Sequence, residues 1–344
     1  MKILITGDRG YIGSVMVPKA INEGYEVVGF DTGYFEENLL SDPYRDYKRI
    51  TCDIRDVKRS HFKDIDSVVH LAGLSNDPLG ELAPHITHDI NHIATIEFAK
   101  IAKSAGVSRF IYASSQSMYG VSDSDNELDE DNSSKNPVTA YAAAKWSAEQ
   151  ELNELIDDDF MVVSFRPSTV FGVSPRLRTD IVFNNLVACA FTTGLIEIKS
   201  DGTPWRPIVH VQDVCDAFLS GLKAPRSLIC GRAYNVGVLG GNYTVREIAE
   251  AAAEACPGAE LIFTGEHTDP RTYKVCFDRI NTELADYFKP KWDLRMGGEE
   301  LMDYFKKINF TSEMFKGRET IRLKQINHLI KSNLIDENLK FLNK

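Results

Sequence analysis

The chain has 344 residues, a formal net charge of −11 and a hydrophobic content of 43%. This composition supplies enough apolar residues for a packed core, and its acidic balance argues against a nucleic-acid binder. No run of 18 or more apolar residues occurs, which predicts no membrane span and no membrane partner. The stretch MKILITGDRG lacks the length and flanks of a signal peptide, so we expect a cytoplasmic protein with reduced cysteines.

Short apolar runs alternate with helical patterns through the first half of the chain. Buried strands are predicted at residues 2–6, 26–31, 67–72, 109–114 and 160–168, with helices at 11–24, 90–106 and 139–156. Alternation of this kind is typical of a parallel sheet that is covered by helices on both faces. The predicted fold is therefore α/β, a Rossmann-type doubly wound parallel sheet.

The second half of the chain has a looser pattern. Residues 1–172 are expected to form the Rossmann domain, and residues 206–237 to return to it as one more strand–helix unit. Residues 173–205 and 238–305 are expected to form a smaller α+β substrate-binding lobe at the C-terminal side. Residues 306–344 are predicted to be a helical tail that docks and takes no part in the active site. The acidic run at 123–132 is interpreted as a solvated loop.

A glycine-rich segment, GDRGYIG, lies between the first predicted strand and the first predicted helix. Gly7, Gly10 and Gly13 allow a tight turn and bring backbone N–H groups close to a pyrophosphate, which the helix N-terminus also favours. Asp31 ends the next strand, 18 residues after Gly13. A carboxylate there accepts hydrogen bonds from both ribose hydroxyls and repels a 2′-phosphate, so the pattern favours NAD over NADP. Asp53 follows a third predicted strand. It has two possible roles there: it contacts the adenine of the cofactor, or it is an ordinary turn residue.

Tyr141 and Lys145 stand four residues apart in YAAAK, on one face of a predicted helix. A nearby ammonium group favours phenolate, which lowers the pKa of a tyrosine from about 10 and lets it act as a base. A hydroxyl from Ser115, at the end of a neighbouring strand, can hold the substrate oxygen. These three residues are the candidate catalytic set.

The motifs together resemble the extended short-chain dehydrogenase/reductases, the nucleotide-sugar epimerase and dehydratase group. The resemblance covers about residues 1–305 and rests on GDRGYIG, Asp31, CDIRD, HLAG, Asn91, SSQSMYG, YAAAK and FRPSTVFG. It implies that Ser115, Tyr141 and Lys145 are catalytic. It implies that the cofactor-binding residues are Gly7, Gly10, Tyr11, Ile12, Gly13, Asp31, Asp53, Ile54, Leu71, Ala72, Tyr141, Lys145 and Pro167.

The resemblance also extends to the substrate, a nucleotide-diphosphate sugar. It implies that Asn185 in NNL, Arg206 in PWRPIVH and Arg271 in DPRTYKV contact the diphosphate, and that Gln116 and Thr169 contact the sugar. It further implies a homodimer, in which the helix at about 88–105 and the Tyr141 helix pack as a four-helix bundle.

Gln116 and Ser117 narrow the reaction that the resemblance allows. The 4,6-dehydratases of the group have Asp and Glu at these two places, and an amide with an unactivated hydroxyl cannot replace them. The 3,5-epimerising members have a cysteine where Ser117 stands, and decarboxylases tend to keep an acid near this place. We therefore expect an NAD-dependent nucleotide-sugar epimerase that acts by transient oxidation at C4 of the sugar.

Three alternatives stay open. The same residues suit a nucleotide-sugar 4-dehydrogenase or ketoreductase, and, with less support, a 4,6-dehydratase or decarboxylase. A protein of this fold can also bind NAD as a sensor and interact with other proteins without catalysis.

His85, His88 and His92 lie at a spacing that a metal site can use, but no carboxylate or cysteine accompanies them at a recognisable spacing, so no metal is predicted.

Overall fold

The structure, a computed structural model, describes residues 1–75, 77–121, 126–266 and 272–342. Within these ranges, seven parallel strands form the main sheet in the order β10-β6-β5-β4-β1-β2-β3. Strand β1 lies in the interior, between β2 and β4, so the chain winds outward from it in both directions, as in a doubly wound sheet. The strands are β1 (Lys2–Thr6), β2 (Glu26–Asp31), β3 (Lys48–Thr51), β4 (Ser67–His70), β5 (Arg109–Ala113), β6 (Met161–Pro167) and β10 (Ala233–Val236).

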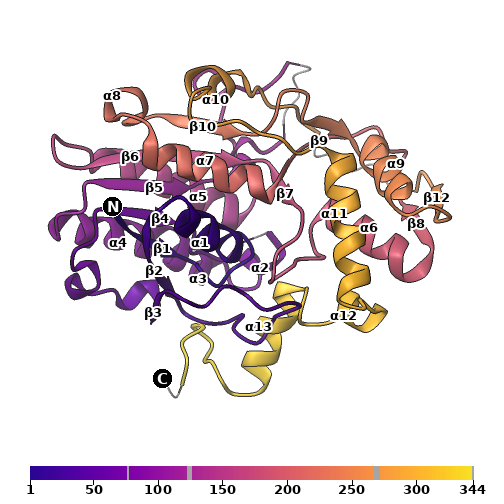
Figure 1. Cartoon of the computed structure of the whole chain (residues 1–344), viewed down its shortest axis with the longest axis horizontal. Helices are drawn as coiled ribbons and strands as arrows, with labels where there is room; N and C mark the ends of the chain where they lie inside the picture. Colours follow the sequence, from indigo (N-terminus) through magenta and orange to yellow (C-terminus); the bar gives the residue numbers. More distant parts are fainter. Residues whose placement is uncertain (76, 122–125, 267–271, 343–344) are drawn as a thin grey trace.

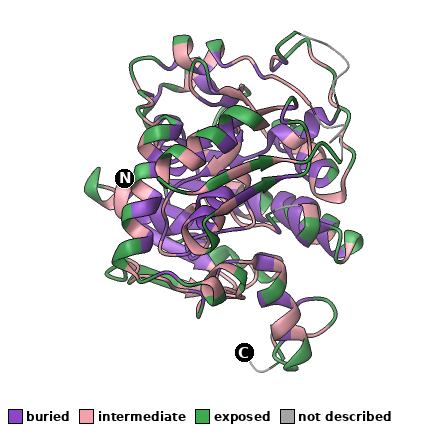
Figure 2. Cartoon of the chain, turned by 90° about the vertical axis from the view of Figure 1, so that its right-hand side faces the viewer, coloured by how far each residue is buried: buried purple, intermediate pink, exposed green. Residues whose placement is uncertain are grey.

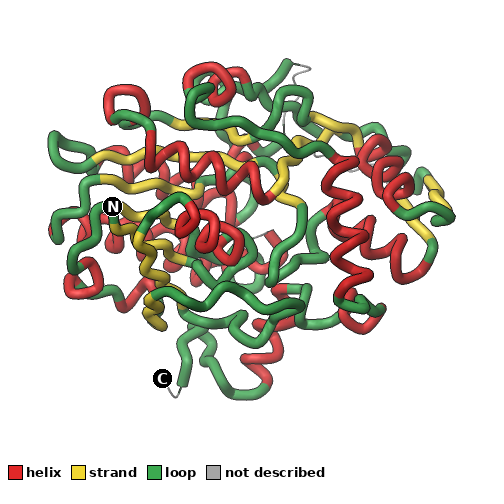
Figure 3. The backbone as a smooth tube through the Cα atoms, viewed as in Figure 1, coloured by secondary structure: helices red, strands yellow, loops and turns green. Residues whose placement is uncertain are grey.

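Helices cover both faces of this sheet (Figures 1 and 3). Ile3 and Ile5 of β1 point to a core formed with α1 (Gly13–Asn22) and α7 (Val211–Lys223). Leu4, between them, points to a second core formed with α4 (Ala94–Ser104) and α5 (Ala140–Glu154). Since residues of both faces are buried, the strands are almost continuously apolar, which is why they could be recognised in the sequence. The predicted α/β fold is confirmed.

The smaller lobe lies beside the carboxyl ends of the main strands, on the right of Figure 1. Helices α6 (Val182–Thr193), α9 (Val245–Ala255) and α11 (Leu294–Lys307) pack against one another there, next to the parallel pair β8 (Leu195–Ile198) and β12 (Glu260–Phe263). Phe183, Ile248 and Leu301 of these helices are fully buried in the same core as α1 and α7. The two lobes therefore share one hydrophobic interior, and Figure 2 shows buried residues, in purple, gathered toward the middle of the fold.

The return of the chain to the main sheet differs from the expectation in one detail. Strand β9 (Trp205–His210) does not join the main sheet but pairs with β7 (Thr169–Phe171) and β11 (Asn242–Thr244). The edge of the main sheet beside β6 is taken by β10, so β9 pairs instead with β7, which follows β6 after a break at Ser168. Helix α7 and strand β10 are the parts of residues 206–237 that return.

The remaining elements are short, apart from the helix of the tail. They are η1 (Ile54–Asp56), η2 (Arg59–Phe62), α2 (Asp77–Gly80), α3 (Pro84–His88), the π-helical turn η3 (Asp89–Ile93), η4 (Gln116–Tyr119), α8 (Arg226–Ile229), α10 (Asp278–Glu283), α12 (Ser312–Lys316) and α13 (Arg322–Lys331). In Figure 1, α12 lies at the lower end of α11, and the part of the tail from α13 onward runs below β2 and β3. Ile326 and Leu329 of α13 are buried in the core on the α4 side, so the tail is packed onto the larger lobe. None of the described helices is long and apolar enough to cross a membrane.

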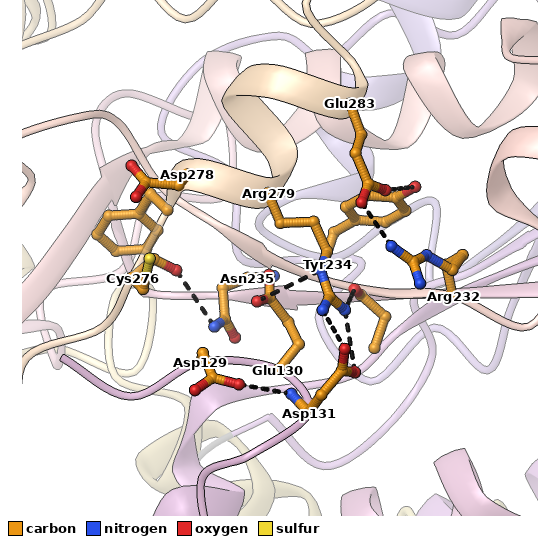
Figure 4. A network of polar contacts seen from close by, with 12 residues as sticks. Asp129, Glu130, Asp131, Arg232, Tyr234, Asn235, Cys276, Asp278, Arg279 and Glu283 are labelled. Atoms are coloured by element: carbon orange, nitrogen blue, oxygen red, sulfur yellow. Dashed lines mark hydrogen bonds and ion pairs between the residues drawn. The ribbon is translucent and has the colours of Figure 1, made fainter.

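The acidic stretch after η4 is not simply solvated in its described part, from residue 126 on. Glu130 is only 4% exposed, and its side chain accepts a hydrogen bond of 2.8 Å from the N–H of Asn235 in β10. Arg279 of α10 pairs with Asp131, and Arg232 pairs with Glu283 (Figure 4). The acidic residues thus connect this loop to the edge strand β10 and to α10. These contacts could not be predicted from a run of acidic residues, which is typical of a solvated loop.

Candidate active site

The glycine loop joins β1 directly to α1. Gly7 has a φ of +69°, and its N–H donates to the carbonyl of Phe30 at 2.9 Å. A Cβ on Gly7 would lie 3.0 Å from the backbone nitrogen of Ala72, and a Cβ on Gly13 would lie 2.1 Å from the carbonyl oxygen of Gly7. Both positions therefore require glycine, and the turn leaves the N-terminus of α1 facing the cavity, where backbone N–H groups favour an anion.

Two carboxylates lie at the ends of the neighbouring strands. Asp31 accepts hydrogen bonds from the N–H of Gly33 at 2.6 Å and from the N–H of Arg9 at 3.3 Å. The guanidinium of Arg9 pairs with Glu36 at 2.9 Å, so its charge is already engaged beside Asp31. Asp53 accepts from the N–H of Arg55 at 2.9 Å and pairs with its guanidinium at 2.7 Å. Asp53 therefore caps its own turn in this structure, although it also faces the cavity.

A cavity of about 570 Å³ lies where the loops after β1, β2, β4, β5 and β6 meet the smaller lobe. In doubly wound folds, ligands bind at this carboxyl edge of the strands, and the volume falls within the usual range of about 300–1,000 Å³ for cofactor and ligand sites. Residues predicted from the sequence form much of its wall: Gly7, Gly10, Tyr11, Ile12, Gly13, Asp31, Asp53, Ile54, Leu71, Ala72, Ser115, Gln116, Tyr141, Lys145, Pro167, Thr169 and Arg206.

Of the predicted substrate residues that the structure describes, one is not found in this wall. Asn185 is not among its lining residues, and its side-chain amide donates to the carbonyl of Thr179 at 2.7 Å. Its neighbour Asn184 is fully buried and donates to Tyr11 Oη at 3.3 Å. Tyr11 in turn donates to the carbonyl of Gly172 at 2.7 Å, so these residues join the glycine loop to the smaller lobe. Arg271 lies outside the described residues.

The SSQSMYG segment leaves β5 and enters the short turn η4. Ser115 caps this turn, accepting from the N–H of Ser117 at 3.1 Å and donating to the Ser117 hydroxyl at 3.0 Å. Gln116 is buried, and both ends of its amide are bonded: Nε2 donates to the carbonyl of Arg166 at 3.0 Å, and Oε1 accepts from Ser168 at 3.1 Å. The Gln116 amide is therefore held in one orientation at the wall of the cavity.

Tyr141 and Lys145 both face the cavity from the first turns of α5, which Thr139 caps. Burial raises the pKa of Tyr141, and the Ser115 hydroxyl acts in the opposite direction. Burial lowers the pKa of Lys145 to about 8, and its ammonium donates to the carbonyl of Ala113 at 2.7 Å. The expected lowering of the Tyr141 pKa by Lys145 is therefore not seen here, because the ammonium is directed to the end of β5.

Several charged and polar residues of the cavity wall were missed by the sequence analysis, among them Arg178 and Asp180. Arg178 pairs with Asp180 at 2.8 Å and donates to the Ser75 hydroxyl at 3.2 Å. Others are Asp77, which accepts from Thr139 at 2.7 Å, Tyr273 and Arg322 of the tail helix. Arg178 stands between two motifs that were recognised, FRPSTVFG and NNL, so a closer examination of that segment could have found it. Nothing near Arg322 in the sequence indicates a site.

The histidines for which no metal was predicted are not among the described residues that line the cavity. His92 shares a contact of 3.1 Å with His88 and pairs with Glu151 of α5 at 2.6 Å, a carboxylate that the sequence did not connect with it. In the parts of the chain that the structure describes, no group of three or more His, Cys, Asp or Glu side chains is arranged to hold a metal ion.

The residues of the cavity fit a dinucleotide. The glycine loop and the start of α1 suit its pyrophosphate, Asp31 suits a ribose, and Ser115, Tyr141 and Lys145 line the same cavity. A doubly wound sheet with this set of residues defines an extended short-chain dehydrogenase/reductase. A model of the NAD dependent epimerase/dehydratase family matches residues 3–237 of the chain. The protein belongs to this family, and its cofactor is NAD.

Known proteins of several activities are similar to this chain. UDP-glucose 4-epimerase of Mycolicibacterium smegmatis is 30% identical over 324 residues, which cover 89% of this chain and 99% of that protein. Human dTDP-D-glucose 4,6-dehydratase is 29% identical over 250 residues, 69% of each chain. The structure of MoeE5 in complex with UDP-glucuronic acid and NAD matches with a TM-score of 0.75 and 25% identity, over 89% of this chain and 99% of that one. The family thus contains both epimerases and dehydratases among the relatives of this protein.

Proposed function

We propose that this protein is a nucleotide-sugar epimerase that acts through transient oxidation at C4 of the sugar. The observation that supports the proposal is the cavity wall itself, which Ser115, Tyr141 and Lys145 line together with the glycine loop. At the two places where dehydratases of the group have acids, this chain has an amide whose two ends are both bonded and a serine hydroxyl bonded to Ser115. Neither group is able to protonate a leaving hydroxyl.

In the proposed reaction, Tyr141 in its phenolate form takes the proton of the C4 hydroxyl and later returns it to the C4 oxygen. NAD, when bound, would supply the acceptor for the C4 hydride and the donor that returns it to the opposite face of C4. Ser115 holds the same sugar oxygen, because its hydroxyl lies next to Tyr141. Because burial raises the pKa of Tyr141, we expect the rate to rise with pH through the neutral range.

The proposed substrate is a nucleotide-diphosphate sugar. Arg206 and Arg178 supply positive charge at the side of the cavity formed by the smaller lobe, where a diphosphate needs it. The similarity to UDP-glucose 4-epimerase, which covers almost the whole length of that protein, supports this substrate class.

We also propose a homodimer through α4 and α5. Ile93, directly before α4, exposes 43% of its surface there.

A second candidate reaction has a specific observation behind it. Asp77 brings a carboxylate to the cavity wall and contributes to the raised pKa of Tyr141, which is consistent with a position near the phenol. A carboxylate there could move the protons that a dehydratase needs, although positions 116 and 117 cannot. The similarity to dTDP-D-glucose 4,6-dehydratase also supports dehydration as the second candidate reaction. A dehydrogenase or ketoreductase would use Tyr141 as the epimerase does and release the oxidised sugar.

The test is the product formed from a set of nucleotide sugars by the wild type and by Tyr141→Phe. We expect the wild type to give a 4-epimer of unchanged mass, and the variant to bind NAD normally but turn over at least about a hundredfold more slowly, the usual scale for a lost acid–base group. A product lighter by one water would establish dehydration, and a keto sugar with reduced cofactor a dehydrogenase. Equal turnover of the variant would refute the role of Tyr141, and bound NAD with no turnover at all would favour a sensor.

A further inference from the structure

The C-terminal tail contributes a side chain to the cavity. From residue 318 to residue 341, the tail contacts the segments that follow β2 and β3, on the adenosine side of the cofactor site. Gln325 donates to the carbonyl of Tyr34 at 3.0 Å, Arg55 donates to the carbonyl of Asn338 at 2.9 Å, and Lys340 pairs with Asp56 at 2.6 Å. These contacts fix the tail and hence the position of Arg322, the first residue of α13.

The guanidinium of Arg322 is buried and incompletely bonded. Arg322 is 1% exposed, and its guanidinium carbon lies 4.5 Å from the centre of the Phe35 ring. Its Nη2 donates a hydrogen bond of 2.7 Å to the carbonyl of Arg176. Nη1 is also buried and has no hydrogen-bond partner among the residues that the structure describes. Arg322 is also a residue of the cavity wall, so an anion bound in the cavity is a candidate partner for this donor.

The charges around Arg322 leave a net positive site. Arg178 is paired with Asp180 at 2.8 Å, and Arg176 lies 3.8 Å from Glu36, which also pairs with Arg9. Burial and the charges of Arg178 and Arg176 lower the pKa of Arg322 to about 9, and the nearby carboxylate of Asp180, which is already paired with Arg178, offsets this only in part. A buried cation of this kind is costly unless an anion meets it.

The place of Arg322 selects the anion. Phe35, against which it stacks, follows β2, and Arg176 reaches Ser14 of α1 at 3.5 Å, so the guanidinium lies on the glycine-loop side of the cavity. We propose that Arg322 donates a charged hydrogen bond to the pyrophosphate of bound NAD, so that the C-terminal tail completes the cofactor site. Diphosphate is also present in a nucleotide sugar, and the experiment distinguishes the two sources. The proposal holds whichever reaction the site performs, because NAD is the cofactor of the family.

The test uses full-length protein stripped of nucleotide, in four forms: wild type, Arg322→Met, Arg322→Lys and the control Lys324→Gln. Lys324 is an exposed residue on the same helix, so its variant removes one positive charge without changing the cavity. Calorimetry measures the Kd of NAD, ADP-ribose, adenosine and UDP, and thermal unfolding without ligand measures the Tm.

We expect Arg322→Met to raise the Kd of NAD and of ADP-ribose about tenfold or more, the scale of one charged hydrogen bond, with adenosine and UDP unchanged. Arg322→Lys keeps the charge and should lose less, and Lys324→Gln should bind like the wild type. The ligand-free Tm of Arg322→Met should equal or exceed that of the wild type, because an uncompensated buried cation is removed. Affinity and stability then move in opposite directions, which a purely structural role would not produce.

Two results overturn the proposal. Unchanged Kd values for NAD and ADP-ribose would mean that Arg322 serves only the packing of the tail. A higher Kd for UDP with an unchanged Kd for NAD would assign the guanidinium to the substrate diphosphate instead. Should Arg322→Met fail to fold, Arg322→Gln carries the same measurements, and its failure as well would show that the guanidinium is needed for folding, which also contradicts the proposal.

Discussion

The buried ion pair of Glu149 and Arg166 offers the sharpest test of how the active-site helix is held. It joins α5, which carries Tyr141, to strand β6, and the two side chains are 2% and 3% exposed. The guanidinium Nε lies 3.2 Å from both carboxylate oxygens, and Nη1 donates to Tyr119 Oη at 3.0 Å. The two charged groups are therefore buried away from water and are hydrogen-bonded to protein atoms instead.

Glu149→Leu removes the carboxylate and leaves the guanidinium buried. Breaking a buried pair in this way costs about 3–5 kcal/mol, since the remaining charge is uncompensated. Total stabilities are about 5–15 kcal/mol, so this single change should remove a large share of the free energy of unfolding. Combining Glu149→Leu with Arg166→Met removes both charges, and we expect that double variant to return to within about 2 kcal/mol of the wild type.

The assay is urea unfolding followed by tryptophan fluorescence, with circular dichroism as a check that both probes report one transition. Trp146 is a suitable reporter, because the centre of its ring lies 5.8 Å from the Arg166 guanidinium carbon. The reasoning is refuted if the double variant is as unstable as Glu149→Leu alone, because the loss would then come from packing and not from an unpaired charge.

Two further predictions concern the glycine loop. Gly13→Ala would bring a Cβ to 2.1 Å from the carbonyl oxygen of Gly7, so we expect calorimetry to show at least about a tenfold loss of NAD affinity, and an unchanged Kd would contradict the fixed turn. Burial and the charge of Asp31 raise the pKa of Asp8 to about 7 from its usual 3.8. A protonated Asp8 therefore stabilises the folded state fully below pH 3.8, and this stabilisation is lost as the pH rises through 7. Asp8→Asn cannot ionise, so between these pH values its free energy of unfolding should rise relative to that of the wild type, by at most about 1.4 kcal/mol per pH unit. A difference between the two proteins that does not change with pH would argue against this shift.

The features that the sequence predicted are those with a local cause. The glycine loop, Asp31 at the end of β2 and the pair Tyr141–Lys145 are each defined by spacing within one strand, turn or helix, and the structure brings them to one cavity. The continuous apolar strands follow in the same way from burial on both faces.

What could not be predicted depends on contacts between distant segments. Arg322 and Arg178 are 144 residues apart in the chain and influence each other only because the tail packs against the segment around Arg176 and Thr179. The choice between Asn184 and Asn185 depends on how α6 is rotated about its axis, which a short motif does not specify. The burial of Glu130 likewise requires β10 to occupy the edge of the sheet, a long-range pairing.

The hydrogen bonds of Tyr11 have a consequence for exchanging parts between relatives of this protein. Its hydroxyl bonds to Gly172 and Asn184, and its carbonyl accepts from Ser174 at 2.8 Å, so a residue of the cofactor loop is anchored in the segment that opens the smaller lobe. A substrate lobe transplanted from another family member at residue 172 would have to bring matching partners for this tyrosine. The substrate range of such chimeras is thus constrained by partners of Tyr11, namely Gly172, Ser174 and Asn184, that are not among the residues lining the cavity, so recombination boundaries are better placed to either side of these contacts.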